Sequence, residues 1–300
     1  MKLSTFDLLK NTPPENGFTL SDEQLKQMQA ILLAMLKDLD SLAEENGIKL
    51  RLGGGNLLGA VRDGKMIPWD DDLDLQISRC DYAPMLSLLR EQRSDVYWVH
   101  TPEDTHNYGI LSARVRLKGT DVRQREDNYS DECGVTVDLF PVENTYDNPA
   151  LRELHGVLCM AAGFLLSCRK FYRDRVAMKK LLSSSSGRWV FYIKAVVGFL
   201  CSLGSVDAWT HFTRNVYALC SNDTSKYVSI PSGRNHYFRE MYLRRDMLSD
   251  HRVFFENGEY YCTADPDTYL TKMYGDYRRI PPPEKRERHF FLSFDLQSGK

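Results

Sequence analysis

The stretch from Gly47 to Leu75, GIKLRLGGGNLLGAVRDGKMIPWDDDLDL, decides the fold of this chain. It predicts a strand over 48–52, three glycines, a helical turn over 56–62 and a second strand over 73–77. The Asp63-Gly64 pair predicts the turn between the helix and the second strand. Strand, helix and strand in so short a segment indicate a mixed α/β core.

Four of the five residues from Asp70 to Asp74 are acidic. Carboxylates at this spacing repel one another, so a bound cation would stabilise the segment. Asp72 and Asp74 share one face of the predicted strand, about 7 Å apart, and their oxygens suit Mg²⁺ or Mn²⁺. An EF-hand loop is excluded because its sixth position would be Leu75 instead of glycine. The segment is either a hard-metal site or a solvated acidic turn.

Two further features support a phosphate site beside this metal site. The first feature is the glycine run Gly53-Gly54-Gly55, which precedes a helix. Free N–H groups and the helix dipole at this position favour binding of an anion. The alternative interpretation of the run is a flexible turn. Asp138, between Val137 and Leu139 on a predicted strand, is either a third acid of the site or a strand-end acid that caps a loop. A glycine turn, an Asp-x-Asp strand and a third acid on a neighbouring strand combine in nucleotidyltransferase-fold enzymes.

The rest of the chain predicts an α+β fold, nucleotidyltransferase-like, with a small mixed sheet flanked by helices and a helical insert. A long helix begins after Ser21, which forms a capping box with Gln24. The other predicted elements are helices over 81–93 and 265–274, strands over 96–100, 110–117 and 135–140, and mostly helix over 151–220. The predicted units are a catalytic core at 1–150, a helical insert at 151–222, and a C-terminal part at 223–300 that completes the catalytic domain.

Composition excludes several classes of protein. The 300 residues are 42% hydrophobic and 27% charged, which excludes a collagen, a disordered chain and a polytopic membrane protein. The net charge of −2 argues against a nucleic-acid partner. Seven cysteines without a C-x-x-C pair suit a reducing compartment. The segment Met1–Asp7 shows no apolar signal region, so we expect the protein to be cytoplasmic.

The block from Gly53 to Asp74 closely resembles the signature of the LicD family, bacterial phosphotransferases related to fukutin and its relatives. Val137–Val142 resembles the second block of the family, and Tyr269–Tyr277 with the following Ile280-Pro281-Pro282 resembles the third. Together the blocks frame residues 20–142 and 225–290. Asn56 replaces the usual serine or threonine and Asp63 the common histidine, which leaves the choice of donor open.

The resemblance implies a Mg²⁺-dependent phosphotransferase. It would move a phosphorylated alcohol from a CDP-activated donor to a hydroxyl of a surface glycan and release CMP. Phosphocholine from CDP-choline is the first expectation, and phosphoribitol or phosphoglycerol the alternatives. The acceptor would be a sugar of lipopolysaccharide, teichoic acid or capsule, or its lipid-linked precursor. A non-catalytic CDP-alcohol or glycan-binding protein is the rival class, and a nucleotidyltransferase acting on RNA or an antibiotic a second rival.

The resemblance also implies the roles of the site residues. Asp72, Asp74 and Asp138 would be the catalytic metal ligands, with Asp138 either a ligand or the base that takes the hydroxyl proton. The donor phosphate would be held by Gly54, Gly55, Asn56, Arg62 and Arg114. For Arg114 and Arg116, which alternate on a strand, a solvated sheet face is the other interpretation. The basic tail either covers the nucleotide or is solvated; it consists of Arg278, Arg279, Arg286, Arg288 and His289.

The charge and apolar pattern of the insert predict that the protein contacts the inner membrane surface peripherally. Residues 154–206 contain eight Lys and Arg and a single acid, a net charge of +7. The apolar runs 157–166 and 189–203 flank these charges and are shorter than the about 20 residues of a crossing helix. Arg169, Lys170, Arg173 and Arg175 are the expected headgroup contacts. The alternative is that both runs are buried in a second core or a dimer interface.

Overall fold

The computed structural model describes residues 14, 16–124, 127, 130–181 and 185–297. Nine strands form one mixed sheet in the order β3-β4-β6-β2-β1-β10-β9, with β7 paired to β6 and β8 to β7. Their bounds are β1 Arg51–Leu52, β2 Asp74–Ser78, β3 Tyr97–His100, β4 Ala113–Leu117, β6 Thr136–Asn144, β7 Tyr227–Ser229, β8 Met241–Leu243, β9 Arg252–Phe255 and β10 Gly258–Tyr261. Strands β5 (Asp121–Gln124) and β11 (Phe291–Asp295) form a separate antiparallel pair.

The α+β class is confirmed, but the sheet is larger than predicted. Strand β2 is parallel to β6, and β1 is parallel to β10, whereas the other pairs are antiparallel. The sequence did not predict β5 or β7 to β11, and the strand predicted over 48–52 is reduced to β1. The division at residues 150 and 222 stays a prediction.

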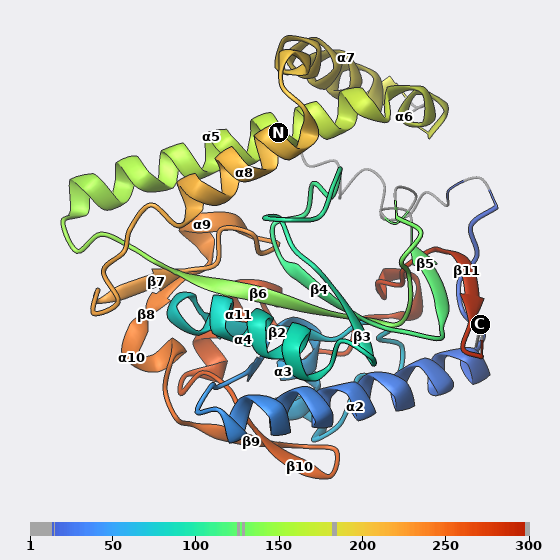
Figure 1. Ribbon diagram of the computed structural model, residues 1–300, viewed down its shortest axis with the longest axis vertical. Helices are drawn as coiled ribbons and strands as arrows, with labels where there is room; N and C mark the ends of the chain where they lie inside the picture. Colours follow the sequence, from blue (N-terminus) through green and yellow to red (C-terminus); the bar gives the residue numbers. More distant parts are fainter. Residues whose placement is uncertain (1–13, 15, 125–126, 128–129, 182–184, 298–300) are drawn as a thin grey trace.

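Helix α2 (Asp22–Glu45) covers one side of the sheet (Figure 1). It begins as predicted, because Ser21 accepts from the amide of Gln24 and the Gln24 side chain accepts from the amide of Ser21. The buried stripe from Leu25 to Leu42 packs into the main hydrophobic core. Helix α3 (Gly54–Asp63) follows β1, and α4 (Arg79–Gln92) follows β2 and starts earlier than predicted because Ser78 caps it.

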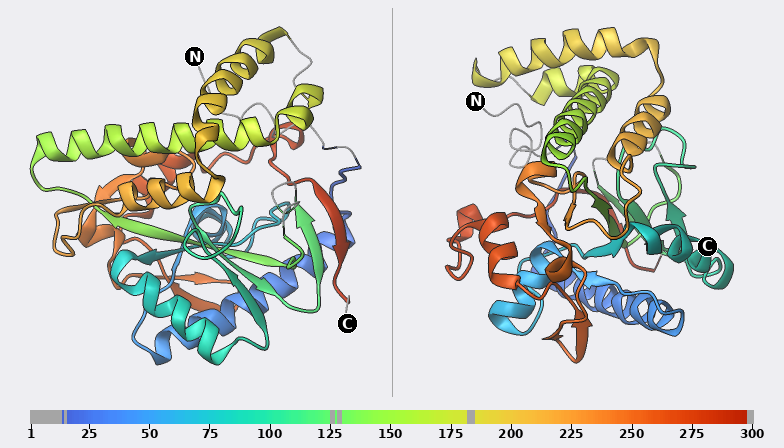
Figure 2. Two further views of the ribbon diagram at one scale, coloured as in Figure 1. Left: turned by 45° about the horizontal axis from the view of Figure 1, so that its top comes forward. Right: turned by 90° about the vertical axis from the view of Figure 1, so that its left-hand side faces the viewer.

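The other side of the sheet carries the helical insert, which stands as a layer of its own in both views of Figure 2. It consists of α5 (Pro149–Arg173), α6 (Arg175–Leu181), α7 (Ser185–Leu200), the 3₁₀ turn η2 (Cys201–Leu203) and α8 (Val206–Tyr217). Among the described helices, α5 alone is long and apolar enough to cross a membrane, and it packs against α7 and α8. The mostly helical character predicted for 151–220 is confirmed.

Short helices complete the C-terminal part: α9 (His236–Arg239), α10 (Arg244–Met247), α11 (Pro266–Tyr274) and the 3₁₀ turn η3 (Pro283–Lys285). Helix α11 starts as predicted, with Asp265 as its N-cap and Pro266 in its first turn. Strand β10 pairs with β1, so this part of the chain extends the same sheet that carries the acidic strand.

Candidate functional site

The acids predicted for the site come together where β2 and β6 run side by side. Asp74 and Asp138 are directly paired positions of these parallel strands. The Asp138 amide donates to the carbonyl of Leu73 at 3.0 Å, which fixes Asp138 beside the Asp72–Asp74 segment. The interpretation of Asp138 as a strand-end cap is therefore wrong, because it lies inside a nine-residue strand.

The carboxylates of this cluster disfavour one another's ionisation. Burial, together with the charges of Asp72 and Asp138, raises the pKa of Asp74 well above its ordinary value. Burial also raises the pKa of Asp72, with Asp71 and Asp138 adding to the effect while His289 opposes it. The pKa of Asp70 rises well above its usual range for the same reason, burial first and the neighbouring acids second. A cation placed among these oxygens would remove the repulsion.

Asn56 holds the acidic segment in place. Its side chain is buried, and its amide nitrogen donates to the carbonyl of Asp72 at 3.3 Å. Its amide oxygen accepts from the backbone N–H of Asp74 at 2.7 Å. Both ends of this side chain are used by the acidic segment, so Asn56 positions Asp72 and Asp74 and is not placed to hold phosphate by its side chain.

The glycine turn lies directly against these acids. A Cβ added at Gly54, where φ is +48°, would lie 2.8 Å from Oδ2 of Asp74, and one at Gly55 would lie 2.3 Å from Oδ2 of Asp70. The Gly54 amide donates to the hydroxyl of Tyr269 at 3.0 Å. The amides of Gly55 and Asn56 precede the first intrahelical bond of α3, from Leu57 to Gly53, and are the ones placed to meet a phosphate.

Helix α11 supports the turn from beneath. The hydroxyl of Tyr269 also accepts from the side chain of Gln76 on β2, at 2.7 Å. Burial raises the pKa of Tyr274 well above its usual range, and Asp70, Asp72 and Asp74 contribute to the rise. The segment that resembles the third family block therefore packs under the acidic cluster.

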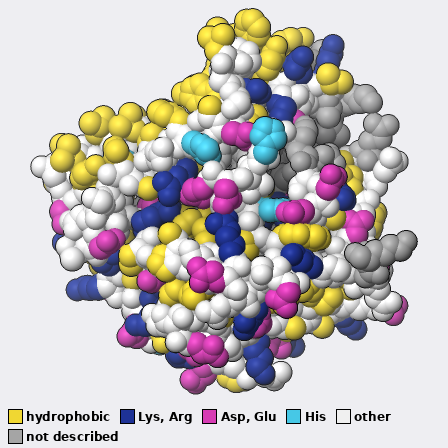
Figure 3. Space-filling view, viewed as in Figure 1, with side chains coloured by type: hydrophobic (Ala, Val, Ile, Leu, Met, Phe, Trp, Pro, Cys, Tyr) yellow, Lys and Arg dark blue, Asp and Glu magenta, His cyan; other side chains and the backbone are white. Residues whose placement is uncertain are grey.

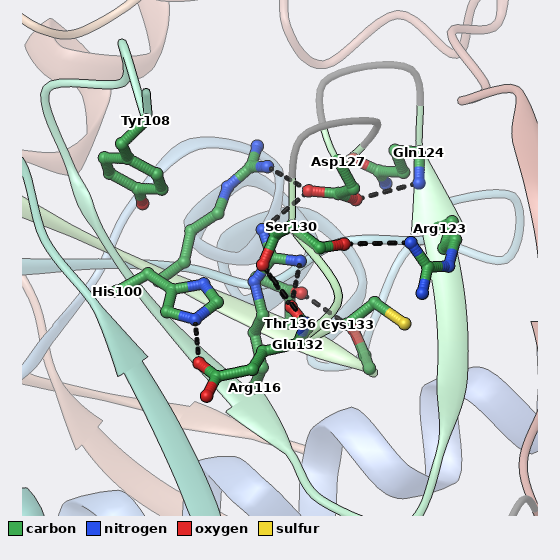
Figure 4. A network of polar contacts seen from close by, with 12 residues as sticks. His100, Tyr108, Arg116, Arg123, Gln124, Asp127, Ser130, Glu132, Cys133 and Thr136 are labelled. Atoms are coloured by element: carbon green, nitrogen blue, oxygen red, sulfur yellow. Dashed lines mark hydrogen bonds and ion pairs between the residues drawn. The ribbon is translucent and has the colours of Figure 1, made fainter. Parts of the chain in front are cut away.

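Arg114 reaches Asp138 and is itself held by a buried acid, Asp127. Its Nε donates to Oδ1 of Asp138 at 3.0 Å, and its Nη1 donates to Oδ1 of Asp127 at 3.2 Å. Arg116 donates to the same oxygen of Asp127 at 2.6 Å (Figure 4). Burial alone would raise the pKa of Asp127, but the two guanidinium groups hold it below its ordinary value. The solvated sheet face suggested for Arg114 and Arg116 is wrong, because both side chains are buried.

Arg62 lies at the end of α3 and pairs with Asp63 at 2.7 Å. Its guanidinium lies 5.8 Å from the ring centre of Trp69, next to the acidic segment. Arg286 lies over the same ring at 4.0 Å. The structure thus places Arg62 near the acids but engages it with Asp63, the residue that departs from the family pattern.

The C-terminal tail reaches the acidic segment, a contact that the sequence did not predict. The ring nitrogen Nδ1 of His289 lies 2.6 Å from Oδ1 of Asp71, and its backbone N–H donates to Oδ2 at 3.1 Å. Among the described residues, Asp71, Asp72 and His289 form the group of three metal-ligating side chains whose ligand atoms lie within 4.8 Å of one another. Asp71 and His289 are 218 positions apart, and no local pattern links them.

These donors fit a hard divalent cation. They are almost all carboxylate oxygens, the ligands that Mg²⁺ and Mn²⁺ prefer. Oδ2 of Asp70 is buried and has no hydrogen-bond partner among the described residues. An acidic cluster with raised pKa values and an unpartnered oxygen, beside the amide end of a helix, can hold a metal and a phosphate together.

Asn56→Ala is expected to lower kcat of the reaction at this site about 100-fold, because Asp72 and Asp74 would be misplaced although both are still present. The test measures kcat and KM of this variant and of Asn56→Ser, which keeps one hydrogen-bonding group. The serine variant should recover part of the loss in kcat. Equal activity of the alanine variant and the wild type would show that Asn56 does not position the acids.

Comparison with known proteins places these features in a family. Residues 47–153 match the family model described as LicD/FKTN/FKRP, nucleotidyltransferase domain. The chain is 23% identical over 278 residues to the lipopolysaccharide cholinephosphotransferase LicD of Haemophilus influenzae, across 88% of this chain and 95% of that protein. An uncharacterised protein of Rickettsia prowazekii is 40% identical over 77 residues, 24% of this chain and 29% of that protein. One of Rickettsia typhi is 42% identical over 69 residues, 21% of this chain and 22% of that protein.

The matched region contains the features assembled above. The glycine turn, the strand with Asp72 and Asp74, and Asp138 all fall within residues 47–153, and the similarity to the Haemophilus protein continues across most of the chain. Residues 47–153 therefore match the LicD/FKTN/FKRP nucleotidyltransferase domain, and most of the chain is similar to a LicD protein.

Proposed function

We propose that this protein transfers phosphocholine from CDP-choline to a sugar hydroxyl of lipopolysaccharide or its lipid-linked precursor, and releases CMP. The observation that carries the proposal is the pairing of Asp74 with Asp138 on adjacent strands, next to the start of α3 at Gly54. The similarity to a lipopolysaccharide cholinephosphotransferase over 88% of the chain supports this choice of substrate. We also propose that the region around the sheet is nucleotidyltransferase-like.

Asp72, Asp74 and Asp138 would hold one or two Mg²⁺ or Mn²⁺ ions. The bound metal would neutralise the donor pyrophosphate and stabilise CMP as the leaving group. We favour these three over the group with Asp71, because Asp71 already accepts two hydrogen bonds from His289. Oδ1 of Asp138 accepts a hydrogen bond from Arg114, so we assign the other oxygen, Oδ2, to the metal.

The chain's own groups orient the donor and the acceptor. The amides of Gly55 and Asn56 would donate to the donor phosphate from the turn after β1. Arg114 on β4 would reach the phosphate from the other side of strands β2 and β6, where it contacts Asp138. In the reaction an acceptor oxygen forms a bond to the phosphorus of the choline phosphate, and the bond from that phosphorus to the CMP oxygen breaks. The hydroxyl proton would pass to Asp138, which is paired with Asp74 across β2 and β6, or leave through the metal site.

We propose a cytoplasmic location, and the thiols support it. All seven cysteines are free. Because free thiols persist in a reducing environment, this supports the proposal that the protein works in the cytoplasm.

The donor is tested by following CMP release. Purified protein with Mg²⁺ and lipopolysaccharide lacking phosphocholine should release CMP from CDP-choline and form a phosphocholine-modified product visible by mass spectrometry. CDP-ribitol and CDP-glycerol measure whether the site prefers another alcohol, and UDP-glucose serves as the nucleotide control. CMP release from CDP-ribitol alone would reassign the donor, and turnover of UDP-glucose alone would contradict the proposal.

A further inference from the structure

Helix α7 and the turn after it turn an apolar face outward. Their exposed hydrophobic side chains have exposed fractions from 40% to 99% and recur at helical spacing: Tyr192, Ile193, Val196, Phe199, Leu200 and Leu203. Hydrophobic side chains gather at the top of the molecule in Figure 3, where Figure 1 places α7. A contiguous apolar patch of this kind marks an interaction surface.

The polarity of this segment is inverted relative to a helix that faces water. Lys194 is the charged residue between Trp189 and Leu203, yet it is 2% exposed and donates to the hydroxyl of Ser167 on α5 at 2.9 Å. Burial lowers its pKa to about 8. A helix in water places its lysine outside and its leucines inside. Here the charge is directed to α5, and the six apolar side chains named above are left outside.

The close contact with α5 fixes which face is outward. A Cβ at Gly198 would lie 2.2 Å from the carbonyl oxygen of Cys168, so the backbones of α7 and α5 touch there. The segment Trp189–Leu203 and the helix that follows it, Val206–Tyr217, differ in direction by 96°. Its fifteen residues reach only about 22 Å, less than the about 30 Å of a bilayer core. This geometry suits a helix that lies along a membrane surface.

The charges of the insert favour an anionic surface. Residues 154–206 carry a net charge of +7, and the single acid, Asp174, pairs with Arg173 at 2.8 Å. Arg175 and Lys179 on α6 are exposed next to α7. A second copy seated face to face on α7 would bring two such positive regions together, which disfavours a dimer.

The predicted headgroup contacts are corrected by the structure. Arg169 donates to the carbonyl of Gly204, Lys170 to that of Gly109 and Arg173 to that of Asn107. These three side chains hold the insert on the fold. Arg175 donates to the carbonyl of Tyr172 within the insert at 2.9 Å, but its side chain is exposed, so Arg175 and Lys179 remain as the exposed contacts.

The same bonds connect the insert to the candidate site. Asn107 and Gly109 belong to the connection between β3 and β4, and Ser112 in that connection donates to Asp138 at 3.3 Å. A membrane bound to α7 would therefore be linked through α5 to the segment beside the acidic cluster.

We propose that the outer face of α7 lies in the interfacial region of an anionic bilayer, with Arg175 and Lys179 on the lipid phosphates. The inference does not depend on the proposed function. The proposed partner of the apolar patch is lipid, and the test also shows whether a second copy of the chain binds there instead.

Flotation with vesicles tests the proposal. The wild-type protein should float with phosphatidylcholine vesicles containing phosphatidylglycerol, less with phosphatidylcholine alone, and less at high salt. Leu200→Ser with Leu203→Ser should lower partitioning by about tenfold or more, because both side chains are largely exposed in the free protein. Arg175→Gln with Lys179→Gln should weaken binding to anionic vesicles about 30-fold and leave binding to neutral vesicles unchanged.

Matched variants separate this surface from general stickiness. Phe254→Ser with Ile280→Ser removes two apolar side chains, 58% and 55% exposed, outside the insert, and Lys26→Gln with Lys37→Gln removes two exposed charges of α2. Both controls should bind as the wild type. No flotation of the wild type with either vesicle would overturn the proposal. It would also be overturned if light scattering showed a dimer that Leu200→Ser with Leu203→Ser dissociates, while the same variant floats like the wild type.

Discussion

Asp74→Asn is expected to abolish phosphocholine transfer while raising the thermal stability of the metal-free protein. Burial and the neighbouring Asp72 and Asp138 raise the pKa of Asp74 in the folded state. A carboxyl with a raised pKa stabilises the fold below its unfolded pKa, and this stabilisation is lost as the pH rises through the folded pKa. The neutral amide removes that loss at neutral pH. In the proposed function Asp74 is a metal ligand that stabilises the transition state, so transfer should fall about 10³-fold.

Calorimetry across the pH range and assays of CMP release measure both effects. The variant should melt above the wild type near neutral pH and match it in acid, where Asp74 is protonated. Mg²⁺ should raise the Tm of the wild type and have little effect on the variant. Asp95→Asn, at an exposed position, is the control and should change neither quantity. Full turnover by Asp74→Asn would remove Asp74 from the site.

His289→Gln separates the two candidate metal groups. If the ions are held by Asp72, Asp74 and Asp138, this variant should keep the Mg²⁺-dependent rise in Tm. The opposite result would be that His289→Gln loses the Mg²⁺-dependent rise in Tm while Asp74→Asn keeps it. That result would assign the metal to Asp71, Asp72 and His289, whose ligand atoms also lie close together.

The parts of the fold that could be predicted are those whose cause is local. Ser21 and Gln24 form the capping box of α2, and Asp265 caps α11, because each bond spans three residues. The glycine turn and the acidic strand are likewise adjacent in sequence. The pairing of Asp74 with Asp138 was reached only through their shared pattern with a family, since strand partners are not encoded locally.

The hairpin of β9 and β10 was missed although its signal is present. Asn257-Gly258 between aromatic and β-branched residues is a strong hairpin pattern. The actual two-residue loop is one position earlier, at Glu256 and Asn257, because Gly258 pairs with Phe255. What no local pattern contains is the parallel pairing of Tyr261 with Arg51, 210 positions away, which attaches this hairpin to the acidic sheet.

Asp127 was also missed, for a different reason. It lies in a polar stretch that has the composition of a solvated loop. The available signal was on β4, where Arg114 and Arg116 share one face of a strand and need a counter-charge once buried. The sequence does not say which of the surrounding acids provides it.

Asp127→Asn is therefore expected to destabilise the protein by about 3–5 kcal/mol. The acid accepts from Arg114 and Arg116 through one oxygen and from the amide of Gln124, at 2.8 Å, through the other. Because its pKa is held below the ordinary value, its stabilisation is present above the unfolded pKa and is lost as the pH falls through the folded pKa. The stability of the variant should depend less on pH in acid.

Urea unfolding of three variants tests this role and its origin. Asp250→Asn breaks the exposed pair with Lys49 and should change stability little, because water screens such pairs. Combining Asp127→Asn with Arg116→Met should recover part of the lost stability, because the second change removes a buried positive charge that the first leaves without a partner. In both variants Arg114 would keep Asp138 and lose Asp127, so it would be held less firmly beside the site. Transfer should therefore be impaired in both, even where stability returns in the double variant. Wild-type stability of Asp127→Asn would mean that the two arginines do not depend on this acid.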